Sequence, residues 1–271
     1  MVTSIWTGAG ARGWVASQEL LDRMYQPFED LLVDAISSET TSRVLDVGCG
    51  TGGTTIAAAR RVGAAGSCTG IDIAAAMIAA ARDRAVAAGA SVSFIVADAQ
   101  TYPFAGADFD AIMSRFGVMF FDDSIAAFTN LRRAARPGAV LRFVAWRSAA
   151  DNPFMTTAER AAAPVLPDLP VRRPDEPGQF AFADRDRVRR ILENSGWSDV
   201  DIHPIDVPCA MPENALVGYL TALGPVGRAL QQADDGLRAR VVAAVRPAFD
   251  AYVHGAEVRF TAACWMVGAR A

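Results

Sequence analysis

The residues with the clearest chemical meaning in this 271-residue sequence form one glycine-rich stretch, Arg43-Val-Leu-Asp-Val-Gly-Cys-Gly-Thr-Gly-Gly53. Its first half is apolar and predicts a short buried strand. The segment Thr54 to Arg60, rich in alanine and free of helix breakers, predicts a helix. The glycines between them let the backbone turn sharply and approach a ligand. A strand, a glycine turn and a helix start present unpaired N–H groups and partial positive charge, which suit a phosphate or a carboxylate.

Asp46 distinguishes two kinds of nucleotide ligand for this turn. The pattern Gly48-x-Gly50-x-x-Gly53 fits the dinucleotide-binding motif in letters. A carboxylate two residues before the first glycine, however, lies unfavourably close to a pyrophosphate. It suits a ligand with an ammonium or sulfonium group, so we expect S-adenosylmethionine, whose amino-acid end has both a carboxylate and an amine. A glycine turn needed only for packing is the alternative.

Composition excludes several other chemistries. All 26 basic residues are arginines, so a Schiff-base lysine, a P-loop lysine and a Tyr-x-x-x-Lys pair are ruled out. The net charge of −4 gives no reason to expect nucleic acid as a partner. The scattered cysteines, at positions 49, 68, 209 and 264, form no zinc-binding pattern, so we expect no metal. Without a signal peptide or a membrane-spanning apolar stretch, we expect a cytoplasmic protein with no membrane span.

Strand and helix patterns alternate from residue 43 to residue 148, which predicts parallel β-α-β units in a sheet with helices on both faces. The carboxyl ends of parallel strands lie at one edge of a sheet, where ligands bind. Asp46, Asp72 and Asp98, in or after the first three strands, should therefore line one cleft. Asp72 could accept both ribose hydroxyls or cap the next helix, and Asp98 could accept from an adenine amine or serve a turn.

The remaining segments predict helical and loop additions to this core. Residues 1–42 predict an N-terminal helical cap, with helices from Val15 to Tyr25 and from Phe28 to Ile36 that are separated at Pro27. Residues 149–181 hold prolines at 164, 167, 170, 174 and 177, which interrupt any helix and predict a Pro-rich lid insert.

Residues 182–271 return to the core pattern. They contain a predicted helix (184–195), a strand (200–207), a helical insertion (213–253) broken at Gly224-Pro225 and Pro247, and a last strand from Val258 to Val267. Residues 43–148 and 182–271 together are therefore expected to form the core domain.

Four motifs in order resemble those of class I S-adenosylmethionine-dependent methyltransferases. They are Val44-Leu-Asp-Val-Gly-Cys-Gly-Thr-Gly52, Gly70-Ile-Asp-Ile73, Val96-Ala-Asp-Ala99 and the Arg136-Pro-Gly138 turn. The Ser114-Arg-Phe-Gly-Val-Met-Phe-Phe121 block and Trp146 are similar to the ubiquinone and menaquinone branch, whose acceptors are small molecules. The resemblance implies a Rossmann-like sheet of seven strands, mostly parallel, whose antiparallel last strand lies beside the fifth.

The resemblance also implies roles for individual residues. The cofactor-binding set is Asp46, Gly48, Cys49, Gly50 and Gly52 at the methionine part, Asp72 at the ribose, Asp98 and Ala99 at the adenine, Ile73 and Met77 near the ribose and base, and Ser114 and Arg115 near the reactive end. The sulfonium is already an activated methyl donor, so the protein must mainly exclude water and align the acceptor. We identify no catalytic base, since His203 and His254 have no recognisable partner and Tyr25 is no stronger a candidate.

The acceptor pocket is expected between the N-terminal cap, the loop after the fourth strand and the two insertions. Its candidate residues are Trp14, Gln18, Tyr25, Phe116 and Met119. Aromatic side chains there suit a small, largely apolar acceptor (aromatic, quinone or natural-product-like). We expect a monomer or a homodimer. A cofactor-binding protein without methyl transfer, such as a cyclase or an interaction module, is the alternative. An NAD-dependent oxidoreductase would leave Asp46 unexplained.

Overall fold

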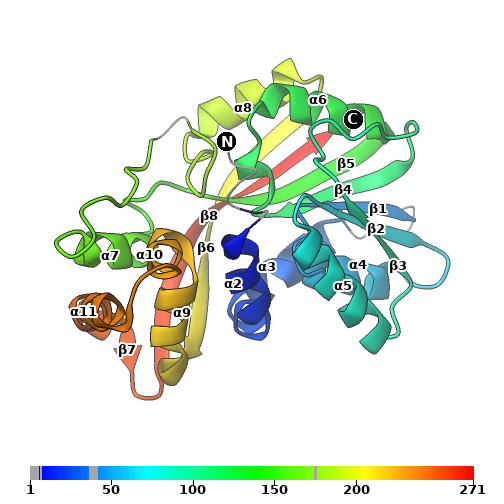
Figure 1. Cartoon of the computed structure of the whole chain (residues 1–271). Helices are drawn as coiled ribbons and strands as arrows, with labels where there is room; N and C mark the ends of the chain where they lie inside the picture. The colour runs from blue at the N-terminus through cyan, green and yellow to red at the C-terminus, as the bar shows by residue number, and fades with distance from the viewer. Residues whose placement is uncertain (1–5, 7, 37–41, 174–175) are drawn as a thin grey trace.

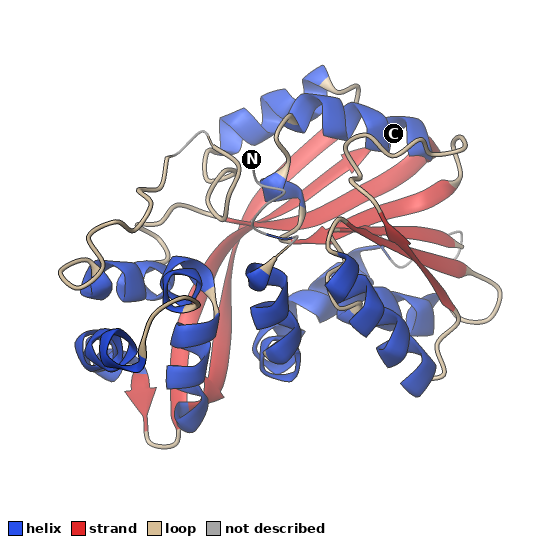
Figure 2. Cartoon of the chain, viewed as in Figure 1, coloured by secondary structure: helices blue, strands red, loops and turns tan. Residues whose placement is uncertain are grey.

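The computed structural model describes residues 6, 8–36, 42–173 and 176–271, and its centre is one twisted sheet (Figures 1 and 2). The strand order is β3-β2-β1-β4-β5-β8-β6, and the short β7 pairs with β8. β1 to β5 are parallel, whereas β8 runs antiparallel to both β5 and β6. The predicted mostly parallel sheet, with its antiparallel last strand beside the fifth, is confirmed. The strands are β1 (Arg43–Val47), β2 (Ser67–Asp72), β3 (Val92–Val96), β4 (Phe109–Arg115), β5 (Ala135–Trp146), β6 (Ser198–Pro212), β7 (Val253–His254) and β8 (Glu257–Arg270).

The helices form two groups. Those around the parallel part of the sheet are α2 (Ala9–Ala16), α3 (Gln18–Ile36), α4 (Gly53–Val62), α5 (Ala75–Ala87), α6 (Ser124–Ala134) and α8 (Arg185–Asn194). α6 and α8 lie on one face, and α3, α4 and α5 lie on the other (Figure 1). The second group is α7 (Pro153–Ala162), α9 (Leu216–Ala222), α10 (Gly224–Leu230) and α11 (Asp235–Val245), with short 3-10 turns at Val118–Phe120, Glu213–Ala215 and Arg246–Tyr252. The predicted breaks at Gly224-Pro225 and Pro247 coincide with the starts of α10 and the last 3-10 turn.

The expected helix break at Pro27 is wrong, because α3 runs for 19 residues with Pro27 inside it. A proline in a helix interior costs about 3 kcal/mol. Leu21, Met24, Phe28 and Leu32 keep helical spacing across the proline and are buried. Each buried side chain of this size contributes roughly 1.5–3 kcal/mol, so their packing outweighs the lost hydrogen bond.

The second group of helices lies beside an antiparallel ribbon that extends past the parallel sheet (Figure 1). β8 pairs with β6 along its whole length, from Arg270 to Glu257, but with β5 only as far as Cys264. Beyond Cys264 the ribbon consists of β6 and β8, with β7 joined to β8 at its end. The buried side chains of β6 switch from the even position Ile202 to the odd positions Val207, Cys209 and Met211. Successive side chains of a strand point to opposite faces, so the covered face changes along the ribbon.

β6 is longer than predicted because its prolines are compatible with its place in the sheet. It is the last strand in the order. Pro204, Pro208 and Pro212 are spaced four residues apart, so their missing N–H groups all face the same edge. A proline is tolerated where that edge is free, and it also blocks pairing with another chain.

The Pro-rich insert contains a helix, contrary to expectation. α7 ends at Ala162, two residues before the first of the five prolines, and Pro153 occupies its first turn, where no N–H is needed. The preceding Asn152 is buried and its amide bridges the backbone of Ala263 in β8: Nδ2 donates to the carbonyl (2.9 Å) and Oδ1 accepts from the N–H (2.9 Å). This clamp fastens α7 to the ribbon.

Asn152→Ala should lower the free energy of unfolding by about 1–3 kcal/mol, since the buried Ala263 N–H loses its partner. The Ala263 carbonyl keeps its hydrogen bond from the Arg147 N–H (3.0 Å). Urea unfolding measures the change. Thr156→Ala, which removes an exposed hydroxyl bond on the same helix, is the matched control and should change stability by less than about 0.5 kcal/mol. Equal losses of unfolding free energy in the two variants would contradict the role of Asn152 in fastening α7 to β8.

Candidate functional site

One cavity of about 510 Å³ begins at the carboxyl ends of β1, β2 and β4 and continues toward α7, α9 and α10. It brings together most of the residues that the sequence singled out: Gly48, Gly50, Asp72, Ile73, Met77, Asp98, Ala99 and Arg115 from the cofactor set, and Trp14, Tyr25, Phe116 and Met119 from the acceptor set. Asp46, Cys49, Gly52, Ser114 and Gln18 are not on the described wall of the cavity. The binding roles of both groups stay predictions.

The glycine turn at the end of β1 touches the loop after β4, backbone against backbone. Gly48 has a φ of +67°, and a Cβ on it would lie 2.7 Å from the Cα of Gly117. The buried Ser114 hydroxyl ties the two segments together, since it donates to the Val47 carbonyl (2.7 Å) and accepts from the Gly117 N–H (3.1 Å). Ser114 therefore positions the cavity floor.

Asp72 both holds the glycine turn and faces the cavity. Its Oδ2 accepts from the Gly50 N–H (2.9 Å) and its Oδ1 from the Ala74 N–H (2.8 Å). Burial raises the pKa of this carboxyl, while the backbone N–H groups act in the opposite direction. A carboxylate has about four acceptor sites, so the backbone bonds leave capacity for hydroxyl donors on the cavity side. Asp98, which also lines the cavity, accepts from the Gln100 N–H (2.9 Å).

Asp46 lies behind the turn rather than on the cavity wall. It is 1% exposed, and its Oδ2 accepts from the Thr55 hydroxyl (2.7 Å) at the start of α4. Burial raises the pKa of Asp46 to about 7, against the lowering effect of Thr55 and of the Arg115 charge. Cys49 and Gly52 also face the protein interior. The Cys49 sulfur would lie 2.8 Å from a Cβ on Gly70 of β2, and the Phe94 ring would lie 2.8 Å from a Cβ on Gly52.

Among the described residues, two buried side-chain polar atoms have no hydrogen-bond partner. They are Nη1 of Arg115, a donor, and Oε1 of Gln18, an acceptor. The Arg115 guanidinium lies 3.9 Å from both Asp22 and Glu29 of α3, and Asp22 is one helical turn after Gln18. Leaving such groups unpaired costs about 1–3 kcal/mol each. An unpaired donor and an unpaired acceptor fit a ligand end with both a carboxylate and an amine.

The sequence analysis missed the polar network that holds α3 against the turn. Arg84 of α5 pairs with Asp22 and donates to the Thr51 carbonyl (2.7 Å) and hydroxyl (2.9 Å). Burial raises the pKa of Glu29, and the Arg115 charge opposes the shift. Asp22 and Glu29 are seven residues apart, on one face of a helix, and that spacing was the available signal.

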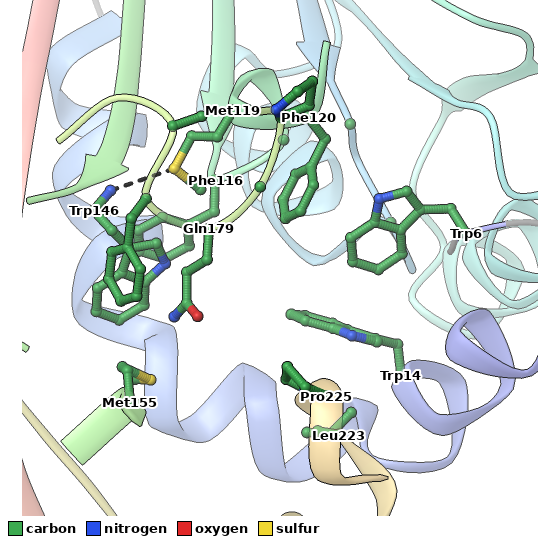
Figure 3. A pocket seen from close by; sticks show the side chains of 18 of the residues that line it. Trp6, Trp14, Phe116, Met119, Phe120, Trp146, Met155, Gln179, Leu223 and Pro225 are labelled. Carbon is green, nitrogen blue, oxygen red and sulfur yellow. Dashed lines mark hydrogen bonds between the residues drawn. The ribbon is translucent and has the colours of Figure 1, made fainter. Parts of the chain in front are cut away.

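Aromatic side chains form the walls beyond the turn (Figure 3). Phe116 stacks on Trp146 with ring centroids 4.8 Å apart and planes 13° apart, and Tyr25 meets both rings edge-on. Phe116 has a φ of +66°, a conformation that costs a bulky residue about 1–3 kcal/mol. Its ring contacts hold it there. Trp6 meets Trp14 and Phe120 on the other side, at 5.7 and 5.0 Å between centroids.

The tyrosines of the cavity are neutral donors. Burial raises the pKa of Tyr25 well above its usual value and that of Tyr219 to about 12, and their side chains are hydrogen-bonded to each other. Neither phenol is set up to act as a base near neutral pH. His203 lies on the exposed side of β6, with Nε2 2.6 Å from Asp201, and neither histidine lines the cavity.

The described residues contain neither a candidate metal-binding group nor a candidate membrane-spanning helix. Among residues 6, 8–36, 42–173 and 176–271, no group of three or more histidine, cysteine or acidic side chains is placed to hold a metal ion. Within the same ranges, no helix combines the length and the hydropathy that a membrane crossing requires.

Comparison with known proteins fits this geometry. A family model described as a methyltransferase domain matches residues 44–138. The aklanonic acid methyltransferase of Streptomyces sp. strain C5 is 39% identical over 107 residues, which cover 39% of this chain and 49% of that protein. The demethylmenaquinone methyltransferase of Renibacterium salmoninarum is 28% identical over 178 residues, 63% of this chain and 72% of that protein.

Solved structures share the fold over most of the chain. A putative methyltransferase from Bacillus halodurans superimposes with a TM-score of 0.59 at 16% identity and covers 89% of this chain and 97% of its own. The cyclase SpnF superimposes with a TM-score of 0.55 at 21% identity, over 90% and 80% of the two chains. Over residues 44–138 the chain is similar to a methyltransferase domain, and its fold is similar to that of a solved putative methyltransferase. The chain spans about half the length of the first of the two relatives above.

Asp46→Asn should remove a pH-dependent loss of stability from the unliganded protein. Between pH about 4 and about 7 the folded state keeps a proton on Asp46 that the unfolded chain releases, so stability falls as pH rises through this window. Between about pH 5 and about pH 8, the free energy of unfolding of the asparagine variant should therefore increase relative to that of wild type, by a few kcal/mol at most. Urea unfolding at the two pH values measures the difference.

Thr55→Val provides the second arm of this test. It removes the hydroxyl that lowers the Asp46 pKa, so the loss of stability should extend to higher pH. Parallel pH profiles of wild type and Asp46→Asn would contradict the assignment.

Proposed function

We propose that the protein transfers a methyl group from S-adenosylmethionine to a small, largely apolar acceptor of the aromatic, quinone or natural-product kind. The observation that carries the proposal is the arrangement around one cavity: two carboxylates at the ends of β2 and β3, a glycine turn, and the unpaired donor of Arg115. The unpaired acceptor of Gln18 lies behind the cavity wall, on the helix whose Asp22 and Glu29 contact Arg115. A cytoplasmic location, and a monomer or homodimer, are part of the same proposal.

Each part of the cofactor has matching residues. In this proposal Asp72 accepts hydrogen bonds from the ribose hydroxyls, and Asp98 with Met77 contacts the base; their positions on the cavity wall support these roles. Arg115 offers a donor to the carboxylate of the methionine part, and Gln18 offers an acceptor to its amine. The bound cofactor supplies the activated methyl group. Tyr25, Phe116 and their aromatic neighbours exclude water and hold the acceptor in line with the bond that breaks.

The affinities of two ligands distinguish the ribose-binding part of the cofactor site from the part that binds the amino-acid end. Asp72→Ala should weaken S-adenosylhomocysteine and 5′-methylthioadenosine alike, by about a hundredfold, because both carry the ribose. Arg115→Met should weaken S-adenosylhomocysteine by about tenfold or more and leave 5′-methylthioadenosine unchanged, because the latter lacks the amino-acid end. Calorimetry measures both affinities. Asp83→Asn, on the exposed side of α5, is the control.

Either of two outcomes would overturn these assignments. Unchanged S-adenosylhomocysteine affinity in Asp72→Ala would remove the ribose role. Equal losses for both ligands in Arg115→Met would mean that the arginine only supports the fold.

Methyl transfer itself is tested with isotopically labelled S-adenosylmethionine and a panel of phenols, quinones and polyketides. We expect label in at least one acceptor and its loss in Asp72→Ala. Cofactor binding without transfer to any member would favour the non-methylating alternative, for which the structural likeness to the cyclase SpnF is the specific observation.

A further inference from the structure

The far end of the cavity holds an excess of positive charge. Glu159 of α7, Arg172 and Arg228 of α10 line it and interact electrostatically with one another. Arg173 and Glu176, which also line the cavity, pair with each other (3.0 Å). Arg172 occupies both oxygens of Glu159, with Nε 2.8 Å from Oε2 and Nη2 hydrogen-bonded to Oε1. Each oxygen of Glu159 therefore accepts one hydrogen bond from Arg172, in a bidentate pair. The Arg172 guanidinium also lies 4.9 Å from the centre of the Phe180 ring.

Arg228 is left without a counter-ion. Among the described residues no carboxylate lies within 4.0 Å of its guanidinium, and no side-chain hydrogen bond satisfies it. Burial lowers the pKa of Arg228, Arg172 lowers it further, and Glu159 opposes both effects. Within this group of three side chains, two guanidinium groups share one carboxylate, so one positive charge of the group is not balanced.

The surroundings of this charge are apolar. Met155, Leu223 and Pro225 line the same region, and the amide of Gln179 points into the cavity between them and the aromatic wall (Figure 3). A charge that is partly removed from water and has no partner is unfavourable, and a bound anion relieves this cost. A guanidinium recognises a carboxylate with two parallel hydrogen bonds.

We propose that the methyl acceptor carries a carboxylate on an apolar, aromatic body, and that Arg228 binds this carboxylate. The proposal rests on the proposed function and adds one charge to its largely apolar acceptor. Arg228 lies at the end of the cavity away from Asp72 and the glycine turn. The carboxylate at Arg228 thus anchors the acceptor, and the methylated atom is a different one, nearer Phe116 and Tyr25.

Binding of paired probes to the S-adenosylhomocysteine complex tests the proposal. The probes are 2-naphthoate and anthraquinone-2-carboxylate, each with its uncharged carboxamide, and calorimetry gives their affinities. Both carboxylates should bind wild type at least tenfold more tightly than their amides. Arg228→Gln should lower carboxylate affinity by about ten- to a hundredfold and leave the amides unchanged.

Two controls keep the result specific. Arg240→Gln, which removes an exposed arginine of α11, should behave as wild type, so a general effect of net charge is excluded. Arg228→Lys should keep part of the preference for the carboxylate. The affinity of each variant for S-adenosylhomocysteine shows that it is folded.

The proposal is overturned if the carboxylates bind no better than the amides, including the case in which neither binds, or if Arg228→Gln retains the wild-type preference. Failure of the proposed function has a different signature, because wild type would then not bind S-adenosylhomocysteine at all.

Discussion

The site depends on the close approach of two backbones, Gly48 after β1 and Gly117 after β4. Neither position has room for a side chain, since a Cβ on either would lie less than 3.0 Å from the other. β1 lies between β2 and β4 in the sheet, so this contact closes the floor of the crevice where the chain order reverses. The Ser114 hydroxyl locks it by bonding to both segments. Phe116 directly precedes Gly117 in the chain. Its backbone has a left-handed conformation, and its ring stacks on Trp146.

The two halves of the cavity have different architectural origins. The carboxylate-rich half is made by loops at the carboxyl ends of parallel strands, as in other α/β proteins. The other half is made by helices that lie on the antiparallel ribbon of β6 and β8, with α7 fastened to it by Asn152. α3 joins the halves, because its acids contact Arg115 and Arg84 at the glycine turn while Tyr25 packs among the aromatic rings. A shift of α3 would therefore alter both halves together.

Charge is distributed unevenly along this cavity. Asp72 and Asp98 lie at one end, and the pair of arginines around Glu159 lies at the other. Between them the walls are aromatic, and the phenols of Tyr25 and Tyr219 stay protonated. Low polarity strengthens the electrostatic contacts that remain. Such a site can orient a cationic nucleotide and an anionic acceptor in opposite directions, so that their uncharged parts meet in the middle.

The sequence by itself determined the parallel core and the place of the carboxylates. Both follow from local patterns: the periodicity of β1 to β5, the glycine run after β1, and acids at the ends of β2 and β3. The position of β8 beside β5 came from family resemblance, and the pairing confirms it. For the parallel core and the carboxylates, this information lies in residues close to one another in the chain.

Only the tertiary structure decided the rest. α3 continues through Pro27 because its buried face packs on the sheet, and β6 tolerates three prolines because it lies at the sheet edge. Gln18 and Arg115 are about a hundred residues apart in the chain, and Arg228 is about 55 to 70 residues from Arg172 and Glu159. Their unpaired atoms become visible only when folding removes them from water. No local sequence pattern shows that these atoms lack partners, because this depends on which distant residues pack around them in the folded chain.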